Sequence, residues 1–243
     1  MYKNLTVAVI IPAFNERPSI EVVINEIKAL QSKDGITIVD DIVVCDNAST
    51  DDTGKIAHAA GARVIREEQR GYGNACLAAI GALGDPDVVV FVDADHSVVA
   101  AELPVLLDDI AAGSDLVIGS RVADKQENNA LTLPQKVGNL LASRLIQLLW
   151  RQPVTDLGPF RAIRYPQLLS LNMQDQRFGW TVEMQVKAIQ AGMRVSEVPV
   201  STLKRIGRSK ISGTVSGVIG AATGIFGMIF KLWLQQRSDR TEK

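Results

Sequence analysis

The chain has 243 residues, of which 47% are hydrophobic and 22% are charged. These values are typical of a globular protein and exclude a disordered chain, a collagen-like repeat and a disulfide scaffold. The formal net charge of −1 argues against a polycation that binds nucleic acid. Cys45 and Cys76 are too few for a disulfide framework and have no metal-type spacing, so we interpret them as buried free thiols.

Short β-branched runs alternate with helical patterns over the first half of the chain. We predict strands at residues 6–11, 40–45, 62–65, 88–92 and 115–118. Between them, apolar residues at helical spacing predict helices at residues 18–30, 52–60, 72–83 and 102–112. Continuously apolar strands joined by helices indicate an α/β fold with an open, mostly parallel sheet and flanking helices. Ligands bind such sheets at the carboxyl ends of the strands.

The pattern changes beyond residue 120. A polar loop is expected at residues 121–133, and residues 153–162 read as irregular. Helices are predicted at residues 135–150 and 181–191, and a strand at residues 194–199. Residues 201–243 carry eight basic and two acidic side chains, so the end of the chain is basic while the remainder is acidic overall.

Polar and aromatic residues follow the first two predicted strands. Residues 12–16 contain no G-x-G-x-x-G pattern, which argues against an NAD or FAD enzyme. Phe14 could lie against a planar base and Glu16 could accept a hydrogen bond from a ribose, although the same residues also suit an ordinary helix-entry turn. Asp46 could accept a proton from a nucleobase, while the polar residues after it suit a helix cap.

Two carboxylates, Asp93 and Asp95, directly follow the apolar residues 88–92. Acidic groups one residue apart at the end of a buried strand repel each other unless a cation lies between them. Mg²⁺ or Mn²⁺ suits such a pair, because these ions keep waters and take further oxygen ligands from a diphosphate. We therefore predict a metal site here, and we interpret His96 as solvent-facing or as a supporting residue rather than a ligand.

This ordered set of motifs resembles family 2 glycosyltransferases of the GT-A fold, and among them the dolichol-phosphate-mannose and dolichol-phosphate-glucose synthases. The matching segments are residues 11–16, 46–53, 70–75, 93–95, 119–121, 156–161, 183–184 and 209–213. Each segment alone is only a weak indication of the family, but the order of the whole set along the chain is specific for it. The resemblance implies inverting transfer of a hexose from a nucleotide-diphosphate sugar to a dolichyl- or undecaprenyl-type polyprenyl phosphate. The reaction would serve cell-envelope (cell wall) or glycoconjugate synthesis at the cytoplasmic face of the membrane.

The resemblance also implies roles for individual residues. The nucleotide sugar would contact Pro12, Phe14, Glu16, Asp46, Gly71, Asp93 and Arg121. The metal ion would be held by Asp93, Asp95 and Ser97, and the catalytic residues would be Asp93, Asp95, Asp156 and Arg205. The acceptor phosphate would face Arg121, Asn139, Arg205, Arg208 and Lys210. Residues 1–210 would then be the glycosyltransferase domain, with a nucleotide-sugar half at 1–120 and an acceptor half at 121–210, followed by a membrane-associating tail at 211–243.

A phosphate acceptor is already ionised at pH 7 and needs no strong general base, which agrees with a chain that has only two histidines. Asp156 or Glu183 could orient the acceptor, or act as a base if the acceptor were a hydroxyl. The loop at residues 121–133 could close over the donor. Asn139 stands where many synthases have a basic residue, and the Asp156 motif is one residue shorter, so the sugar and the acceptor stay open.

Three alternatives remain at this point. The first is a family 2 enzyme with a saccharide or other acceptor that is not a lipid phosphate. The second is a catalytically silent scaffold that binds a nucleotide sugar at the membrane. The third is a nucleotidyltransferase, but no glycine-rich phosphate loop followed by a basic residue lies near the first strand.

Residues 211–230 contain no charged side chain, and a helix of this length would measure about 30 Å, close to the thickness of a bilayer core. Small residues recur every four positions, at Ser212, Ser216, Gly220 and Gly224. Flanking cations and Trp233 suit a lipid interface. We predict an amphipathic helix on the membrane or a short hairpin. A span within residues 211–234, a helix packed in the core and a homodimer contact are the alternatives.

Overall fold

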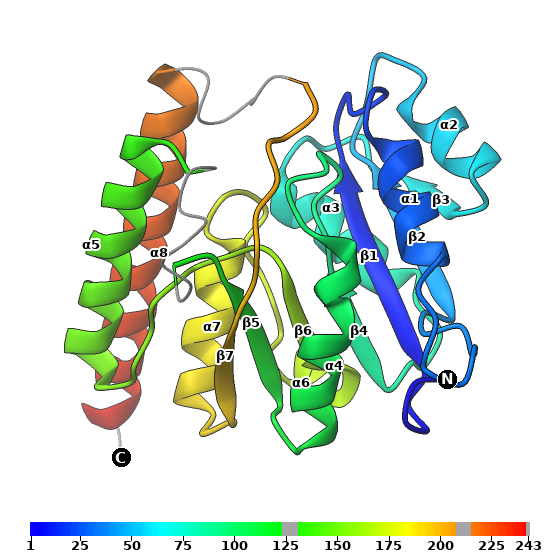
Figure 1. Ribbon diagram of the computed structural model, residues 1–243. Coiled ribbons are helices and arrows are strands. Elements are labelled where there is room, and N and C mark those ends of the chain that lie inside the picture. Colours follow the sequence, from blue (N-terminus) through cyan, green and yellow to red (C-terminus); the bar gives the residue numbers. More distant parts are fainter. Residues whose placement is uncertain (123–130, 208–214, 242–243) are drawn as a thin grey trace.

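The computed structural model describes residues 1–122, 131–207 and 215–241. In these residues one sheet of seven strands has the order β3-β2-β1-β4-β6-β5-β7, with helices on both faces (Figure 1). The strands are β1 (Val7–Ala13), β2 (Asp41–Asp46), β3 (Arg63–Arg66), β4 (Val88–Phe91), β5 (Leu116–Ser120), β6 (Arg161–Arg164) and β7 (Val195–Pro199). The α-helices are α1 (Ile20–Lys28), α2 (Thr53–Ala59), α3 (Tyr72–Gly81), α4 (Leu103–Ala111), α5 (Leu133–Trp150), α6 (Tyr165–Ser170), α7 (Trp180–Gln190) and α8 (Val215–Thr241).

Alternate residues of the central strands belong to two separate cores. Val9 and Ile11 of β1 pack with α1 and α4 on one face, whereas Ile10 packs with α3 and α7 on the other. Because both faces are covered, the strands are apolar at nearly every position, and this pattern is what makes a parallel sheet predictable from the sequence. The predicted α/β class, the mostly parallel sheet and the strand–helix alternation over the first half of the chain are confirmed.

The strand β6 contradicts the prediction that residues 153–162 are irregular throughout. It lies between β4 and β5 and is antiparallel to both, while the other strand pairs in the described part of the chain are parallel. Its sequence begins and ends with an arginine, so it lacks the continuous apolar run by which the other central strands were predicted. Arg161 is 1% exposed and donates hydrogen bonds to the carbonyls of Gly158 and Thr181, and these bonds allow a guanidinium to be buried in the sheet.

The tail forms a long helix that packs on the rest of the protein. Met228, Ile229 and Leu232 of α8 are buried in a third core together with Val182 and Val186 of α7 and residues of α5. Among the described residues, no helix combines the length and the apolar character that a bilayer crossing requires. Residues 215–241 thus match the alternative of a helix packed on the core, whereas residues 211–214 lie outside the described part.

Truncating the buried face of α8 should destabilise the protein. Leu232 is 3% exposed and Leu234 is 57% exposed, so the two leucines form a matched pair on one helix. We expect Leu232→Ala to lower the free energy of unfolding by about 2–4 kcal/mol, because it leaves a cavity in a packed core. Leu234→Ala should change it by less than about 0.5 kcal/mol. Urea denaturation measures both, and equal effects would show that α8 is not part of the folded core.

Candidate functional site

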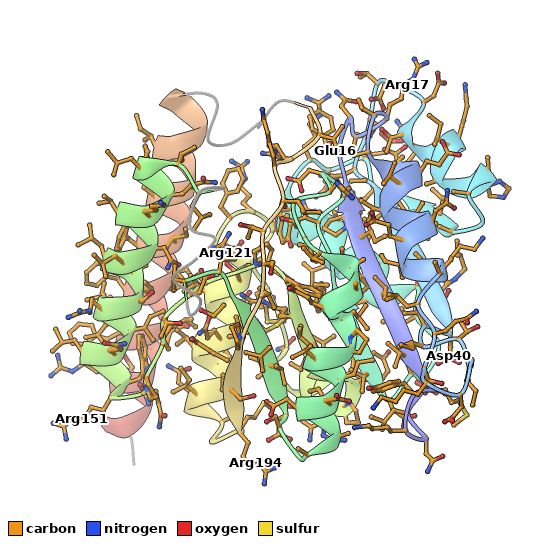
Figure 2. All side chains as sticks on the ribbon, viewed as in Figure 1. Glu16, Arg17, Asp40, Arg121, Arg151 and Arg194 are labelled. Carbon is orange, nitrogen blue, oxygen red and sulfur yellow. The ribbon has the colours of Figure 1, made fainter. Side chains whose placement is uncertain are left out.

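A cavity of about 340 Å³ opens beyond the carboxyl ends of β1, β2 and β4. Figure 2 shows the direction of the strands. Glu16 and Arg121, which follow β1 and β5, lie higher in this view than Asp40 and Arg194, which precede β2 and β7. The cavity lining is Pro12, Ala13, Phe14, Glu16, Asn47, Arg70, Gly71, Tyr72, Ala75, Asp93, Ala94, Asp95, Phe178 and Arg205. Of the residues assigned from the sequence, it contains Pro12, Phe14, Glu16, Gly71, Asp93, Asp95 and Arg205.

The turn after β1 is held by hydrogen bonds to the turn after β2. Asn15 has a left-handed backbone with φ of 52°, and its side-chain oxygen accepts the N–H of Thr50 at 2.8 Å. The N–H of Glu16 donates to the Thr53 hydroxyl at 2.9 Å. This bracing presents the Phe14 ring to the cavity, where the guanidinium of Arg70 lies 4.6 Å from the ring centre. The aromatic surface proposed for a base therefore carries a cation beside it.

Asp46 does not line the cavity, and its carboxylate makes contacts within the protein. It accepts the N–H of Ser49 at 3.0 Å and pairs with Arg66 at 3.0 Å. The next residue, Asn47, does line the cavity, and sequence reasoning missed it. Its amide donates to the carbonyl of Gln69 at 2.8 Å and accepts the N–H of Gly71 at 2.8 Å, so it fastens the loop before α3 to the site.

The glycines at the start of α3 allow close backbone contact. A Cβ added at Gly71 would lie 2.1 Å from the carbonyl oxygen of Gln176, and one at Gly73 would lie 2.0 Å from that of Asp175. The N–H groups of Gly73 and Asn74 donate to carbonyls of the same segment. This helix start is therefore satisfied by the chain itself, and its glycines are required by packing.

Asp93 and Asp95 lie together in the cavity wall. Burial and the charge of Asp95 raise the pKa of Asp93 to about 7, and the charges of Arg121 and Arg205 only partly oppose this rise. The hydroxyl of Tyr72 donates to Asp93 at 3.3 Å, and burial holds the pKa of Tyr72 well above its ordinary value, so this donor stays protonated. The repulsion predicted from the spacing of the two acids is thus present.

The cation that faces Asp95 is Arg205, which forms an ion pair with its carboxylate. The backbone brings Arg205 there, because the N–H of Ile206 donates to the carbonyl of Asp95 and the N–H of Leu203 donates to the carbonyl of Ser97. Ser97 does not line the cavity, and its own N–H donates to the Asp95 carboxylate at 2.9 Å. His96 contacts Glu26 at 2.9 Å, in agreement with a role other than metal ligand.

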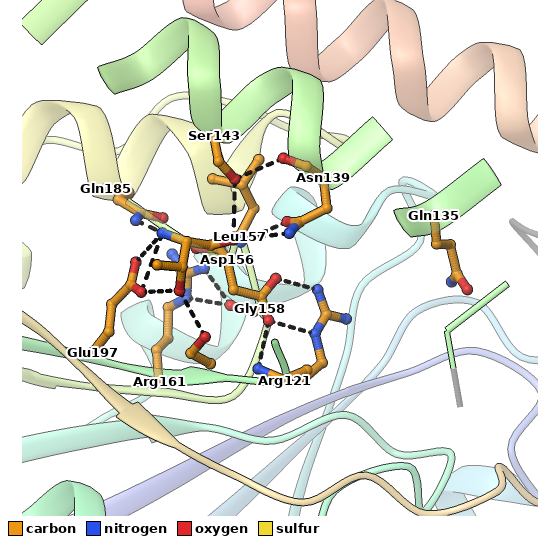
Figure 3. Close-up of polar contacts among 12 residues, drawn as sticks. Arg121, Gln135, Asn139, Ser143, Asp156, Leu157, Gly158, Arg161, Gln185 and Glu197 are labelled. Carbon is orange, nitrogen blue, oxygen red and sulfur yellow. Dashed lines mark hydrogen bonds and ion pairs between the residues drawn. The ribbon is translucent and has the colours of Figure 1, made fainter. Parts of the chain in front are cut away.

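Arg121, Asn139 and Asp156 form a polar cluster in which Asp156 is buried and the other two are half-buried, and none of the three lines the cavity (Figure 3). Asp156 is fully buried and accepts three hydrogen bonds from Arg121, at 2.7–2.8 Å. Burial alone would raise the pKa of Asp156, but the hydrogen bonds and charge of Arg121 outweigh it and lower that pKa. A carboxylate held in this way suits orientation of Arg121 better than proton transfer, and the charge of Arg121 in turn acts on Asp93.

Asn139 binds backbone on both sides of Asp156. Its amide donates to the carbonyl of Thr155 at 3.0 Å, and its oxygen accepts the N–H of Leu157 at 3.0 Å. Glu183 has a similar task elsewhere, since it accepts the N–H groups of Gln174 and Asp175. Neither side chain lines the cavity. Arg208 and Lys210, assigned to the acceptor phosphate, lie outside the described residues.

Comparison with known proteins places these features in one family. Residues 8–169 match Glycosyl transferase family 2, which is more than half of the chain. An uncharacterized glycosyltransferase of Mycobacterium tuberculosis is 37% identical over 216 residues, which cover 88% of this chain and 93% of that protein. The dolichyl-phosphate hexose transferase of Haloferax volcanii is 34% identical over 233 residues, which cover 95% of each chain.

The fold is also that of a solved glycosyltransferase. A crystal structure of glucosyl-3-phosphoglycerate synthase from Mycobacterium tuberculosis, in complex with Mn²⁺, UDP and phosphoglyceric acid, matches with a TM-score of 0.74. The match covers 95% of this chain and 79% of that chain at 23% identity, so it establishes the fold alone. The sequence match and the relatives establish more: this chain belongs to glycosyltransferase family 2, and it is a glycosyltransferase of the GT-A fold.

Proposed function

We propose that the protein transfers a hexose, with inversion, from a nucleotide-diphosphate sugar to a polyprenyl phosphate at the cytoplasmic face of a membrane. The observation that carries the proposal is that Asp93 and Asp95 line the same cavity as Phe14 and Glu16, so a diphosphate site adjoins a nucleoside site. The name of the Haloferax volcanii relative supports a lipid-phosphate acceptor and a hexose. The UDP bound by the fold neighbour supports the donor class.

The donor atoms at the end of β4 fit a hard divalent cation. Asp93 and Asp95 offer carboxylate oxygens to one cavity, and the described residues contain no group of three or more His, Cys, Asp or Glu side chains that could hold a metal. A site with two carboxylates leaves room for waters and for diphosphate oxygens, which is how Mg²⁺ and Mn²⁺ are usually bound. The bound ion would neutralise charge that develops on the departing diphosphate.

The protein's own positive charge near Asp93 and Asp95 comes from Arg205 and Arg121. The Nε of Arg205 is buried without a hydrogen-bond partner among the described residues, and the side chain lines the cavity. It is therefore a donor suited to a phosphate oxygen. Arg121, fixed by Asp156, adds a second positive charge near Asp93. An acceptor phosphate is ionised at pH 7, so this scheme needs orientation and charge stabilisation rather than a strong base.

One face of α5 suits contact with a lipid surface. At 100° per residue, its exposed apolar side chains share one face with Arg144; the residues are Leu133, Val137, Leu140, Leu141, Arg144 and Leu148. The exposed Arg151 directly follows the helix. The helix contains no acidic residue. The neighbouring α8 exposes Ile219, Phe230 and Leu234 (Figure 1). Apolar side chains mixed with cations match the surface of an anionic bilayer, where a polyprenyl phosphate resides.

The reaction is tested by incubating membranes that contain the protein with labelled UDP- and GDP-hexoses, with and without Mn²⁺. We expect label in the lipid extract, and Asp95→Asn should reduce the rate at least about a hundredfold, because it removes a main electrostatic stabiliser. The matched control is Asp85→Asn, an exposed acid outside the cavity. Label that reaches only soluble phosphates or saccharides would favour a non-lipid acceptor. Label in lipid that is unaffected by Asp95→Asn would contradict the proposed site.

Metal binding should depend on pH because of Asp93. Its pKa of about 7 leaves the carboxyl largely protonated at lower pH, so a cation must then displace a proton. We expect the apparent affinity for Mn²⁺ to fall about tenfold for each pH unit below about 7 and to level off above it. Electron paramagnetic resonance of free Mn²⁺ measures this. An affinity that stays constant across this range would show that Asp93 does not bind the ion.

Membrane association should depend on the exposed face of α5. We expect Leu140→Glu and Leu148→Glu each to weaken binding to vesicles of anionic phospholipid about tenfold, since each removes an exposed leucine that would enter the bilayer and adds a charge of the same sign as the lipid. Leu169→Glu is the control, because Leu169 is a 53% exposed leucine on α6. Vesicle co-sedimentation measures the affinities. Equal losses of vesicle affinity in all three variants would show that the exposed face of α5 is not the surface that contacts the membrane.

A further inference from the structure

One aromatic side chain lies between the cavity and helix α8. Phe178 precedes α7, lines the cavity and lies against α8. A Cβ added at Gly220 would be 3.6 Å from the Phe178 ring, and one added at Gly224 would be 3.3 Å from the Phe178 Cβ. The ring therefore occupies the space between α8 and the cavity. No motif of the sequence singled out Phe178.

The helix that supports Phe178 is itself firmly attached. The indole N–H of Trp150 on α5 donates to the side chain of Gln236 at 2.8 Å, and the amide of Gln190 on α7 donates to the carbonyl of Leu232 at 3.3 Å. Next to Phe178, a Cβ added at Gly179 would lie 3.0 Å from the Cβ of Met228, so α7 and α8 approach each other closely. A Cβ added at Gly224 also comes within 3.6 Å of the Gly179 nitrogen and 3.7 Å of the Phe178 carbonyl carbon, so a side chain there presses on the residues that hold the Phe178 ring.

The chemistry of the other cavity walls indicates which part of a bound donor would meet Phe178. Phe14, Glu16 and Asn47 lie at the ends of β1 and β2, and the two carboxylates lie at the end of β4. A donor whose nucleoside occupies the first region and whose diphosphate occupies the second extends its sugar toward the remaining walls. Phe178 provides an apolar ring there, and the C–H face of a hexose packs well on such a surface.

We propose that Phe178 contacts the hexose of the donor and that Gly220 and Gly224 of α8 are positioning residues that seat its ring. The inference rests on the proposed function, because it takes the cavity to be a nucleotide-sugar site. It assigns to α8 a part in sugar recognition in addition to any contact with lipid.

Gly227 provides a matched control on the same helix, because a Cβ added there meets no atom within 4 Å. Gly224→Val and Gly227→Val are compared by calorimetric titration with UDP-glucose, GDP-mannose, UDP and GDP in the presence of Mn²⁺. For the nucleotide sugar that binds wild type best, we expect Gly224→Val to raise Kd about tenfold and Gly227→Val less than about twofold. The Kd of the matching diphosphate should change by less than about threefold in both variants.

A double substitution then tests whether the glycines of α8 act on sugar binding through Phe178. Gly220→Val and Phe178→Ala should each weaken binding of the nucleotide sugar. In the Phe178→Ala background Gly220→Val should have no further effect, because the ring atoms that a side chain at Gly220 meets are gone. Additive effects of the two substitutions would overturn the inference. So would equal losses for nucleotide sugar and bare diphosphate, or equal losses in Gly224→Val and Gly227→Val. Urea denaturation monitors folding, and Gly224→Ala replaces the valine variant if the latter is unfolded.

The outcomes also separate the two proposals. If wild type binds a nucleotide sugar and Gly224→Val binds it equally well, the role of Phe178 is wrong while the proposed function stands. If wild type binds none of the nucleotide sugars or diphosphates, the cavity is not a donor site and both proposals are overturned.

Discussion

The site depends on the repulsion between two carboxylates at the end of a buried strand. Asp93 and Asp95 lie one residue apart in the wall of one cavity, and the charge of Asp95 helps to raise the pKa of Asp93 to about 7. The fold places one guanidinium, that of Arg205, against the second acid, and a backbone segment bonded to residues 95–97 carries it there. A further cation bound beside Asp93 would relieve this repulsion.

Several side chains to which the sequence analysis gave a possible role in the site hold other parts of the protein in place and do not line the cavity. Asn139 binds the residues on both sides of Asp156, and Asp156 in turn fixes Arg121. Glu183 holds the segment that leads to Phe178. None of these groups lines the cavity, so their substitution would alter the backbone around the site without removing any atom that lines it.

The sequence predicts most of the sheet, because strands buried on both faces are apolar at nearly every position. It fails at β6, where a buried arginine satisfied by backbone carbonyls makes a central strand look polar. For the site, convergence of strand ends correctly grouped Phe14 with Asp93. The orientation of Asp46 was not predictable, because its partner Arg66 comes from the neighbouring strand. Phe178 was equally hidden, since its place in the wall depends on α8, far away in sequence.

The insertion of β6 has a consequence for how the two halves of the chain relate. β6 comes from residues 121–210, which the sequence predicted as an acceptor half, yet it separates β4 from β5, both of which belong to the first 120 residues. A fragment that stopped at Ser120 would leave β4 with an open hydrogen-bonding edge and β5 without a partner strand. Unpaired edges of this kind recruit other chains. We therefore expect a fragment cut at Ser120 to aggregate, and any exchange of the segment after Ser120 must keep a strand that pairs with both β4 and β5.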